Sequence, residues 1–101
     1  MSIKKIEQAR AYVANRKELT NRLKHVLVER LALDREADEI PDDCLLFGVG
    51  LGLDSVDALE IIVVIESEFD IRVEDDDMQE IRSVNSIVDF ILLRQNEEGE
   101  L

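Results

Sequence analysis

The stretch GLGLDSVDALEIIVVIESEFDI, from Gly50 to Ile71, decides the fold because it contains a helix start followed by a long apolar run. Asp54 is a residue type whose side chain accepts hydrogen bonds from the first free backbone N–H groups of a helix. Asp57, three residues later, lies in the first turn, where negative charge is stabilised. These signals predict a helix from about Ser55 to Phe69.

The apolar residues of this predicted helix form two groups. One group recurs at helical spacing and is expected to face the core: Ala58, Ile61, Ile62, Ile65 and Phe69. Val56 and Val63 project roughly opposite, beside Glu60 and Glu66, with Leu59 at the margin. Scattered exposed valines are ordinary. An apolar centre with an acidic border is also typical of a transient docking surface, because charge steers the encounter and apolar contact holds it.

The rest of the chain also predicts helices. Residues 3–33 contain no Gly or Pro and have helical spacing, with a break or bend expected in 15–21, where Asn15 or Thr20 could cap a second start. Residues 34–53 are predicted to form a long loop. Its apolar side chains are expected to pin it across the open side of a bundle: Ile40, Leu45, Leu46, Phe47, Leu51 and Leu53.

The C-terminal part predicts two further helices. The acidic segment Glu74–Glu80 can cap a short third helix. Ser83 is expected to cap the last one, whose apolar residues recur on one face: Val84, Ile87, Val88, Ile91 and Leu92. The sequence therefore predicts an all-α, four-helix bundle with a helical, basic extension over 1–19, a domain over 20–95 and a flexible tail over 96–101.

Composition and charge limit the function. The 101 residues suffice for one small domain, and the single Cys44 rules out a disulfide framework within the chain. The net charge is −12, with eight Lys/Arg against three Glu in 1–33 and four Arg against twenty-one acids in 34–101. Such a surface repels nucleic acid and anionic lipid and attracts basic docking patches. With no membrane-length apolar run and no signal peptide, we expect a cytoplasmic monomer.

Enzymatic chemistry has few candidate residues. His25 has no nucleophile near it in sequence, and Cys44 has neither a CxxC partner nor metal-ligand spacing. The cluster Glu74 to Asp77 lacks the central Gly of a calcium loop, and GVGLGLDS lacks the lysine of a phosphate-binding loop. We therefore expect no catalytic and no metal site.

Ser55 needs an explanation, since Asp54 already supplies the cap. One interpretation is a polar filler or an alternative N-cap. The other is that its hydroxyl is a substrate, because a phosphodiester attached there would meet the partial positive charge of a helix N-terminus. The preceding glycines would leave the side chain accessible to a modifying enzyme.

Two consecutive stretches of the sequence resemble the acyl carrier proteins of fatty acid and polyketide synthesis. They are LGLDSVDALEIIVVIESEFDI and its continuation RVEDDDMQEIRSVNSIVDFI. The family hallmark is Asp-Ser-Leu at the start of its second helix, and Asp54-Ser55-Val56 matches it with one conservative change. The resemblance covers about 20–94. It implies the four-helix carrier fold and a carrier rather than an enzyme.

The resemblance also implies a prosthetic group and partners. Ser55 would receive 4′-phosphopantetheine from coenzyme A, and the thiol of that arm would carry acyl chains as thioesters. The partners would be a phosphopantetheinyl transferase and acyl-transferring, ketosynthase-type or acyl-activating enzymes with basic patches. The residues at matching docking positions are Asp54, Val56, Asp57, Glu60, Val63, Glu66 and Asp75.

Two departures from the family favour a specialised carrier over housekeeping fatty acid synthesis. The loop VGLGLDS lacks acids just before the leucine-glycine step, and the basic residues 1–19 are extra. An aminoacyl or peptidyl carrier, and an unmodified acidic helical adaptor, remain alternatives at this point.

Overall fold

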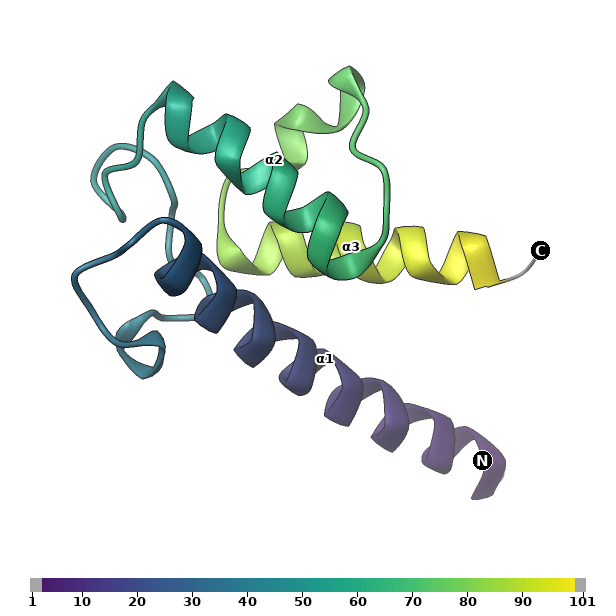
Figure 1. Ribbon diagram of the computed structural model, residues 1–101. Helices are drawn as coiled ribbons and strands as arrows, with labels where there is room; N and C mark the ends of the chain where they lie inside the picture. The colour runs from purple at the N-terminus through teal and green to yellow at the C-terminus, as the bar shows by residue number, and fades with distance from the viewer. Residues whose placement is uncertain (1–2, 100–101) are drawn as a thin grey trace.

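The computed structural model describes the backbone of residues 3–99 and the side chains of residues 7–95. Within that range the chain forms three α-helices and two short 3₁₀ helices: α1 (Ile3–Arg30), η1 (Ala37–Glu39), α2 (Ser55–Phe69), η2 (Asp75–Glu80) and α3 (Val84–Gly99) (Figure 1). The predicted all-α fold is confirmed. The short third helix of the prediction is η2, and none of the described helices is long and apolar enough to cross a membrane.

Helix α1 is continuous, so the predicted break in 15–21 is wrong. The Thr20 hydroxyl donates to the Arg16 carbonyl at 2.8 Å, a bond made inside the helix and not at a new helix start. Arg16 in turn donates to the Asp89 carboxylate at 2.5 Å, which ties α1 to α3. With no Gly or Pro in this segment, nothing interrupts the helix.

Helix α2 begins and ends where the sequence predicts, but its buried face differs from the prediction. Val64 is completely buried, whereas Ile62 and Ala58 are only partly buried. The cause is the run of five β-branched residues from Ile61 to Ile65, which offers an apolar side chain at every angle around the helix. Ile61, Ile65 and Phe69 are buried as predicted.

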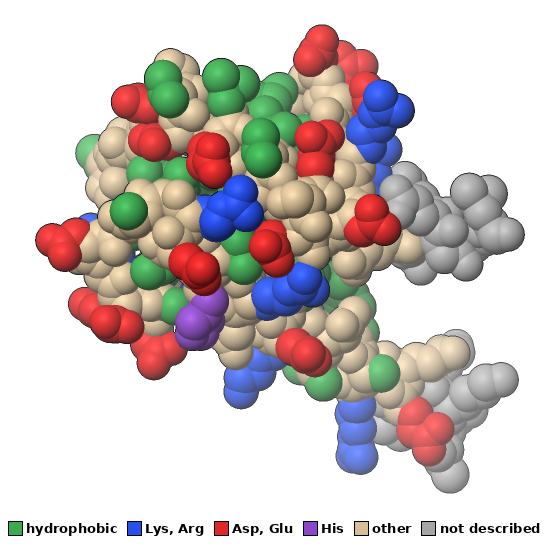
Figure 2. All heavy atoms as spheres, viewed as in Figure 1, with side chains coloured by type: hydrophobic (Ala, Val, Ile, Leu, Met, Phe, Trp, Pro, Cys, Tyr) green, Lys and Arg blue, Asp and Glu red, His purple; other side chains and the backbone are tan. Residues whose placement is uncertain are grey.

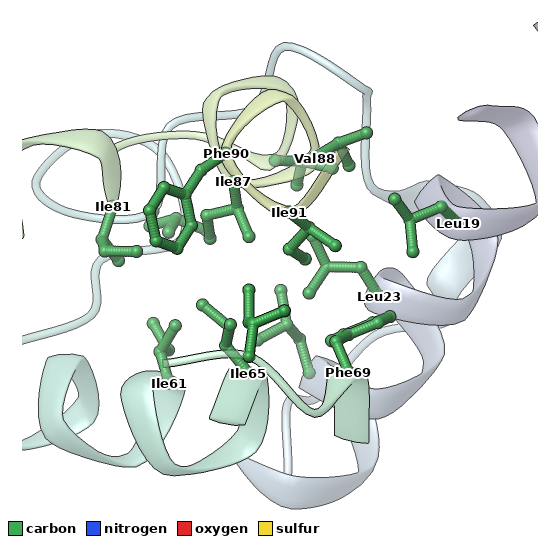
Figure 3. Packing of buried hydrophobic residues seen from close by; sticks show 14 of the residues in the cluster. Leu19, Leu23, Ile61, Ile65, Phe69, Ile81, Ile87, Val88, Phe90 and Ile91 are labelled. Atoms are coloured by element: carbon green, nitrogen blue, oxygen red, sulfur yellow. The ribbon is translucent and has the colours of Figure 1, made fainter. Parts of the chain in front are cut away.

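The core lies between α1, α2 and α3. Figure 3 shows Ile61, Ile65 and Phe69 of α2 pointing toward side chains of α3 and α1. The buried cluster is aliphatic apart from Phe69 and Phe90. The remaining labelled members are Leu19, Leu23, Ile81, Ile87, Val88, Phe90 and Ile91.

The loop between α1 and α2 is pinned against the bundle, as predicted. Ile40 and Leu46 are buried, and three further apolar side chains pack partly buried on the core: Phe47, Leu51 and Leu53. Leu45 is the exception, with its side chain half exposed. The Leu46 N–H donates to the Arg82 carbonyl at 2.9 Å, so the loop is held by backbone as well as by side chains.

Helix α3 has the predicted cap. The Ser86 N–H donates to the Ser83 hydroxyl at 3.1 Å, and the Ser83 N–H donates to the Ser86 hydroxyl at 2.9 Å. The predicted apolar stripe is buried except for Leu92, which is partly buried. The helix continues to Gly99, into the segment predicted as a tail, and residues 100–101 of that segment lie outside the described residues.

Candidate functional site

Two aspartates build the start of α2. The Asp54 Oδ1 atom accepts from the N–H groups of Val56 and Asp57, each at 3.0 Å. The Asp57 Oδ2 atom accepts from the Asp54 N–H at 3.0 Å, which closes a reciprocal capping box. Helix α2 thus begins at Ser55 without using the serine side chain.

The charge of Asp54 is part of this cap. The N–H of Asp57, followed by that of Val56, holds the pKa of the Asp54 carboxyl below its usual value. Asp54 therefore stays ionised at neutral pH and faces the positive end of the helix dipole. Because both of its hydrogen bonds go to backbone, Asp54 acts first as a helix cap.

Ser55 is exposed at this helix end. Within the described part of the chain, its hydroxyl makes no hydrogen bond. A free hydroxyl at a helix N-terminus fits a covalently attached phosphodiester, because the dipole stabilises the added negative charge.

The loop before Ser55 has a fixed shape. Gly50 lies so close to the Leu45 backbone that an added Cβ would be 1.8 Å from the Leu45 carbonyl oxygen. The Leu51 N–H donates to that same carbonyl at 2.9 Å, and the Leu53 N–H donates to the Leu46 carbonyl at 3.0 Å. These hydrogen bonds fix the backbone of the loop that leads to Asp54. Ser55 therefore directly follows an ordered loop.

Beside Ser55, α2 carries an exposed stripe that we name the apolar face: Val56, Leu59 and Val63, which are 71%, 63% and 49% exposed. Val56 and Val63 lie where the sequence predicts. Leu59, predicted at the margin, is a full member of the face. Figure 2 shows acidic, basic and hydrophobic side chains intermixed on the side of the molecule that includes α2.

Arginines of α1 form ion pairs with some of the acids that border the apolar face. The sequence did not predict these ion pairs. Glu60 lies 3.6 Å from Arg30, and Glu68 lies 3.8 Å from Arg30 and 3.7 Å from Arg22. The Arg22 guanidinium also stacks 4.7 Å above the Phe69 ring. No local sequence signal links these arginines to acids some thirty or more residues away, because α1 and α2 become neighbours only by packing.

The predicted docking acids Glu66 and Asp75, and the neighbouring Asp77, differ in their hydrogen bonds and ion pairs. The Glu66 Oε2 atom accepts from the Val73 N–H at 3.0 Å, so this carboxylate holds the segment after α2. Asp75 is exposed at the start of η2. Asp77 caps η2 through the Glu74 N–H at 2.9 Å and pairs with Arg94 at 2.6 Å, and these contacts lower the pKa of Asp77.

The residues considered for catalysis lie apart from this site. His25 is exposed on α1, with its Nδ1 atom 2.8 Å from the Asn21 carbonyl oxygen. Cys44 is a free thiol, partly buried against the core. Among the side chains that the structure describes, no group of three or more His, Cys, Asp or Glu residues could hold a metal ion.

Comparison with known proteins identifies the family of this chain. The family model for a phosphopantetheine attachment site matches residues 21–91. An acyl carrier protein from Thermotoga maritima is 32% identical over 79 residues, which are 78% of this chain and 94% of the relative. The crystal structure of an acyl carrier protein from Thermotoga maritima superposes with a TM-score of 0.68 at 27% identity, over 81% of this chain and 92% of the other. The chain therefore belongs to the acyl carrier protein family, whose members are carriers rather than catalysts and bear a covalently attached phosphopantetheine.

Proposed function

We propose that Ser55 is the residue that bears the phosphopantetheine, and that this chain carries acyl intermediates of fatty acid, polyketide or related lipid synthesis. One observation carries the assignment of the site. Ser55 is the exposed first residue of α2, and its hydroxyl is left free because Asp54 makes the cap.

The residues around Ser55 favour attachment. When bound, the group supplies a thiol that holds an acyl chain as a thioester. In the transfer, the Ser55 oxygen would form the bond to phosphorus, the phosphoanhydride of coenzyme A would break, and adenosine 3′,5′-bisphosphate would leave. The hydroxyl proton would pass to a base of the transferase. The capping box of Asp54 and Asp57 fixes the backbone on either side of Ser55.

The apolar face is proposed to receive the partner enzymes. Its exposed side chains supply the contact that excludes water, and the acids around it steer basic partners. Asp75 is the acid most available for steering, since it is exposed and makes no ion pair with a described cation; Asp57 makes no such pair either, but one of its oxygens accepts from the Asp54 N–H. Glu60 contributes less because Arg30 faces it, and Glu66 contributes less because it binds the Val73 N–H.

Intact-mass spectrometry tests the attachment site. We expect a broad-specificity phosphopantetheinyl transferase with coenzyme A to add one phosphopantetheine to the wild type and none to Ser55→Ala. Ser67→Ala is the matched control, because Ser67 is also an exposed serine of α2. It should be modified like the wild type. An unmodified wild type, or a modified Ser55→Ala, contradicts the proposal.

A further inference from the structure

The two borders of the apolar face on α2 lie against different elements. Glu60 and Glu66 are three residues before and three residues after Val63, so at about 100° per residue they flank Val63 on opposite sides. Glu60 is on the side of α1, because it contacts Arg30, and Glu66 is on the side of the segment that leads to η2, because it accepts from the Val73 N–H. Figure 1 shows α1 and η2 on opposite sides of α2.

On the side of α1, arginines and acids form a connected row that we name the α1 border: Arg22, Glu68, Arg30 and Glu60. Arg30 lies between two carboxylates, 3.6 Å from Glu60 and 3.8 Å from Glu68. Arg22 lies 3.7 Å from the Glu68 carboxylate and donates to the Glu68 carbonyl at 2.5 Å. The stacking of Arg22 on the Phe69 ring holds it there. With two positive and two negative charges, the α1 border is neutral.

The two arginines of the α1 border are at the surface, where a docking protein would meet them. The side chain of Arg30 is 37% exposed and that of Arg22 is 52% exposed. A lysine or arginine of a partner that is placed over Glu60 therefore also approaches Arg30. Repulsion between these two cations offsets the attraction of Glu60, so the α1 border disfavours a basic patch.

The opposite side, which we name the η2 border, keeps a negative charge. Its charged residues are four acids and one arginine: Glu66, Arg72, Glu74, Asp75 and Asp76. Arg72 lies 3.5 Å from Glu74 and offsets one of these acids. Asp75 and Asp76 are exposed, and neither forms an ion pair in the part of the chain that the structure describes. Cations of a partner are therefore attracted to the η2 border.

We infer that partner enzymes dock on α2 with their cations over the η2 border only, and that Arg30 is a specificity-determining residue that keeps a basic patch off the α1 border. This inference rests on the proposed function, because it concerns the enzymes that act on Ser55. The partner that fits has an apolar centre over Val56, Leu59 and Val63. It has basic residues along one edge of that centre, and uncharged or acidic residues along the edge that meets α1.

Double-mutant cycles on kcat/KM test the inference, with a broad-specificity phosphopantetheinyl transferase and coenzyme A as the probe. The salt concentration is about 0.1 M, where exposed charges more than about 10 Å apart are largely screened. Asp75→Asn should lower kcat/KM by a few-fold, whereas Glu60→Gln should leave it within about 1.5-fold of the wild type. Arg30→Gln should raise kcat/KM by about twofold, and Glu60→Gln should remove that gain in the Arg30→Gln background. Asp75→Asn should have the same effect in both backgrounds, because it lies on the other border.

Arg30→Lys is the matched control, because it keeps the positive charge, and its kcat/KM should stay close to the wild-type value. The intact mass at the end of each reaction separates this inference from the proposed function. If the wild type gains no phosphopantetheine, the proposed function fails, and the inference fails with it. If all variants are modified to completion, the inference alone is overturned by an equal loss of kcat/KM in Glu60→Gln and Asp75→Asn, or by a loss in Arg30→Gln.

Discussion

Adjacent valines of α2 give a direct test of how the helix divides its two faces. Val64 is completely buried and Val63 is 49% exposed. Replacing either by alanine removes two carbon groups, at about 0.8 kcal/mol each when buried. At position 64 the remaining cavity raises the cost to about 2–3 kcal/mol. At position 63 about half of the group is already in water, so the loss is about 0.8 kcal/mol.

Helix propensity does not affect the comparison. Alanine is favoured over valine in a helix by about 0.5 kcal/mol at both positions, so this gain cancels in the difference. We therefore expect Val64→Ala to be less stable than Val63→Ala by about 1–2 kcal/mol. For a domain of this size that difference is about 4–16 °C in melting temperature. Thermal unfolding followed by circular dichroism measures the melting temperature, and urea unfolding measures the free energy of unfolding.

The order of the two variants should be the reverse for transferase kcat/KM. Val63→Ala removes part of the apolar face and should lower the transferase kcat/KM by a few-fold. Val64→Ala, assayed well below its melting temperature, should keep the wild-type value. Equal melting temperatures for the two variants, or a larger kcat/KM loss in Val64→Ala, would refute the division of α2 into a core face and a partner face.

Three further changes test other parts of the structure. Arg30→Gln should release Glu60, while Glu68 keeps its contact with Arg22, and should raise kcat/KM with the transferase by about two- to fivefold at low salt. The exposed Arg35→Gln is the control, and an equal rise in both variants would point to net charge alone. The pKa values of Asp54 and Asp77 are lowered on folding from 3.8, so their stabilisation is complete above that pH and is lost as pH falls through the folded-state values. Melting temperature should therefore fall as pH is lowered below about 4, and fall less in Asp54→Asn, which keeps a cap. An equal pH dependence in the variant would contradict the role of the Asp54 charge. Gly50→Ala should melt at a lower temperature than Gly48→Ala, because a Cβ at position 50 meets the Leu45 carbonyl. Position 48 is open, and an alanine there has only the cost of about 1 kcal/mol for its positive φ. The opposite order of melting temperatures would show that the loop adapts to the added Cβ.

Local chemistry explains what could be predicted from the sequence. The start of α2 at Ser55 follows from the Asp54 cap, and the start of α3 follows from the Ser83 cap. Both depend on hydrogen bonds between residues two to three positions apart, which are present in the sequence itself. The exposure of Val56 and Val63 follows from helical spacing relative to the charged residues around them. These local signals left Ser55 as either a polar filler or a modified residue, and the resemblance to acyl carrier proteins made it the candidate attachment site.

The tertiary structure alone decided which contacts form between distant segments. The phase of the buried face of α2 was ambiguous within the run Ile61 to Ile65, and in the folded chain Val64 is completely buried whereas Ile62 is only partly buried. The sequence offered Asn15 or Thr20 as the cap of a second helix, but α1 is unbroken there, and Arg16 from this stretch binds Asp89 of α3. Glu60 became a partner of Arg30 only because α1 packs beside α2, and such ion pairs depend on a distance that no local pattern encodes.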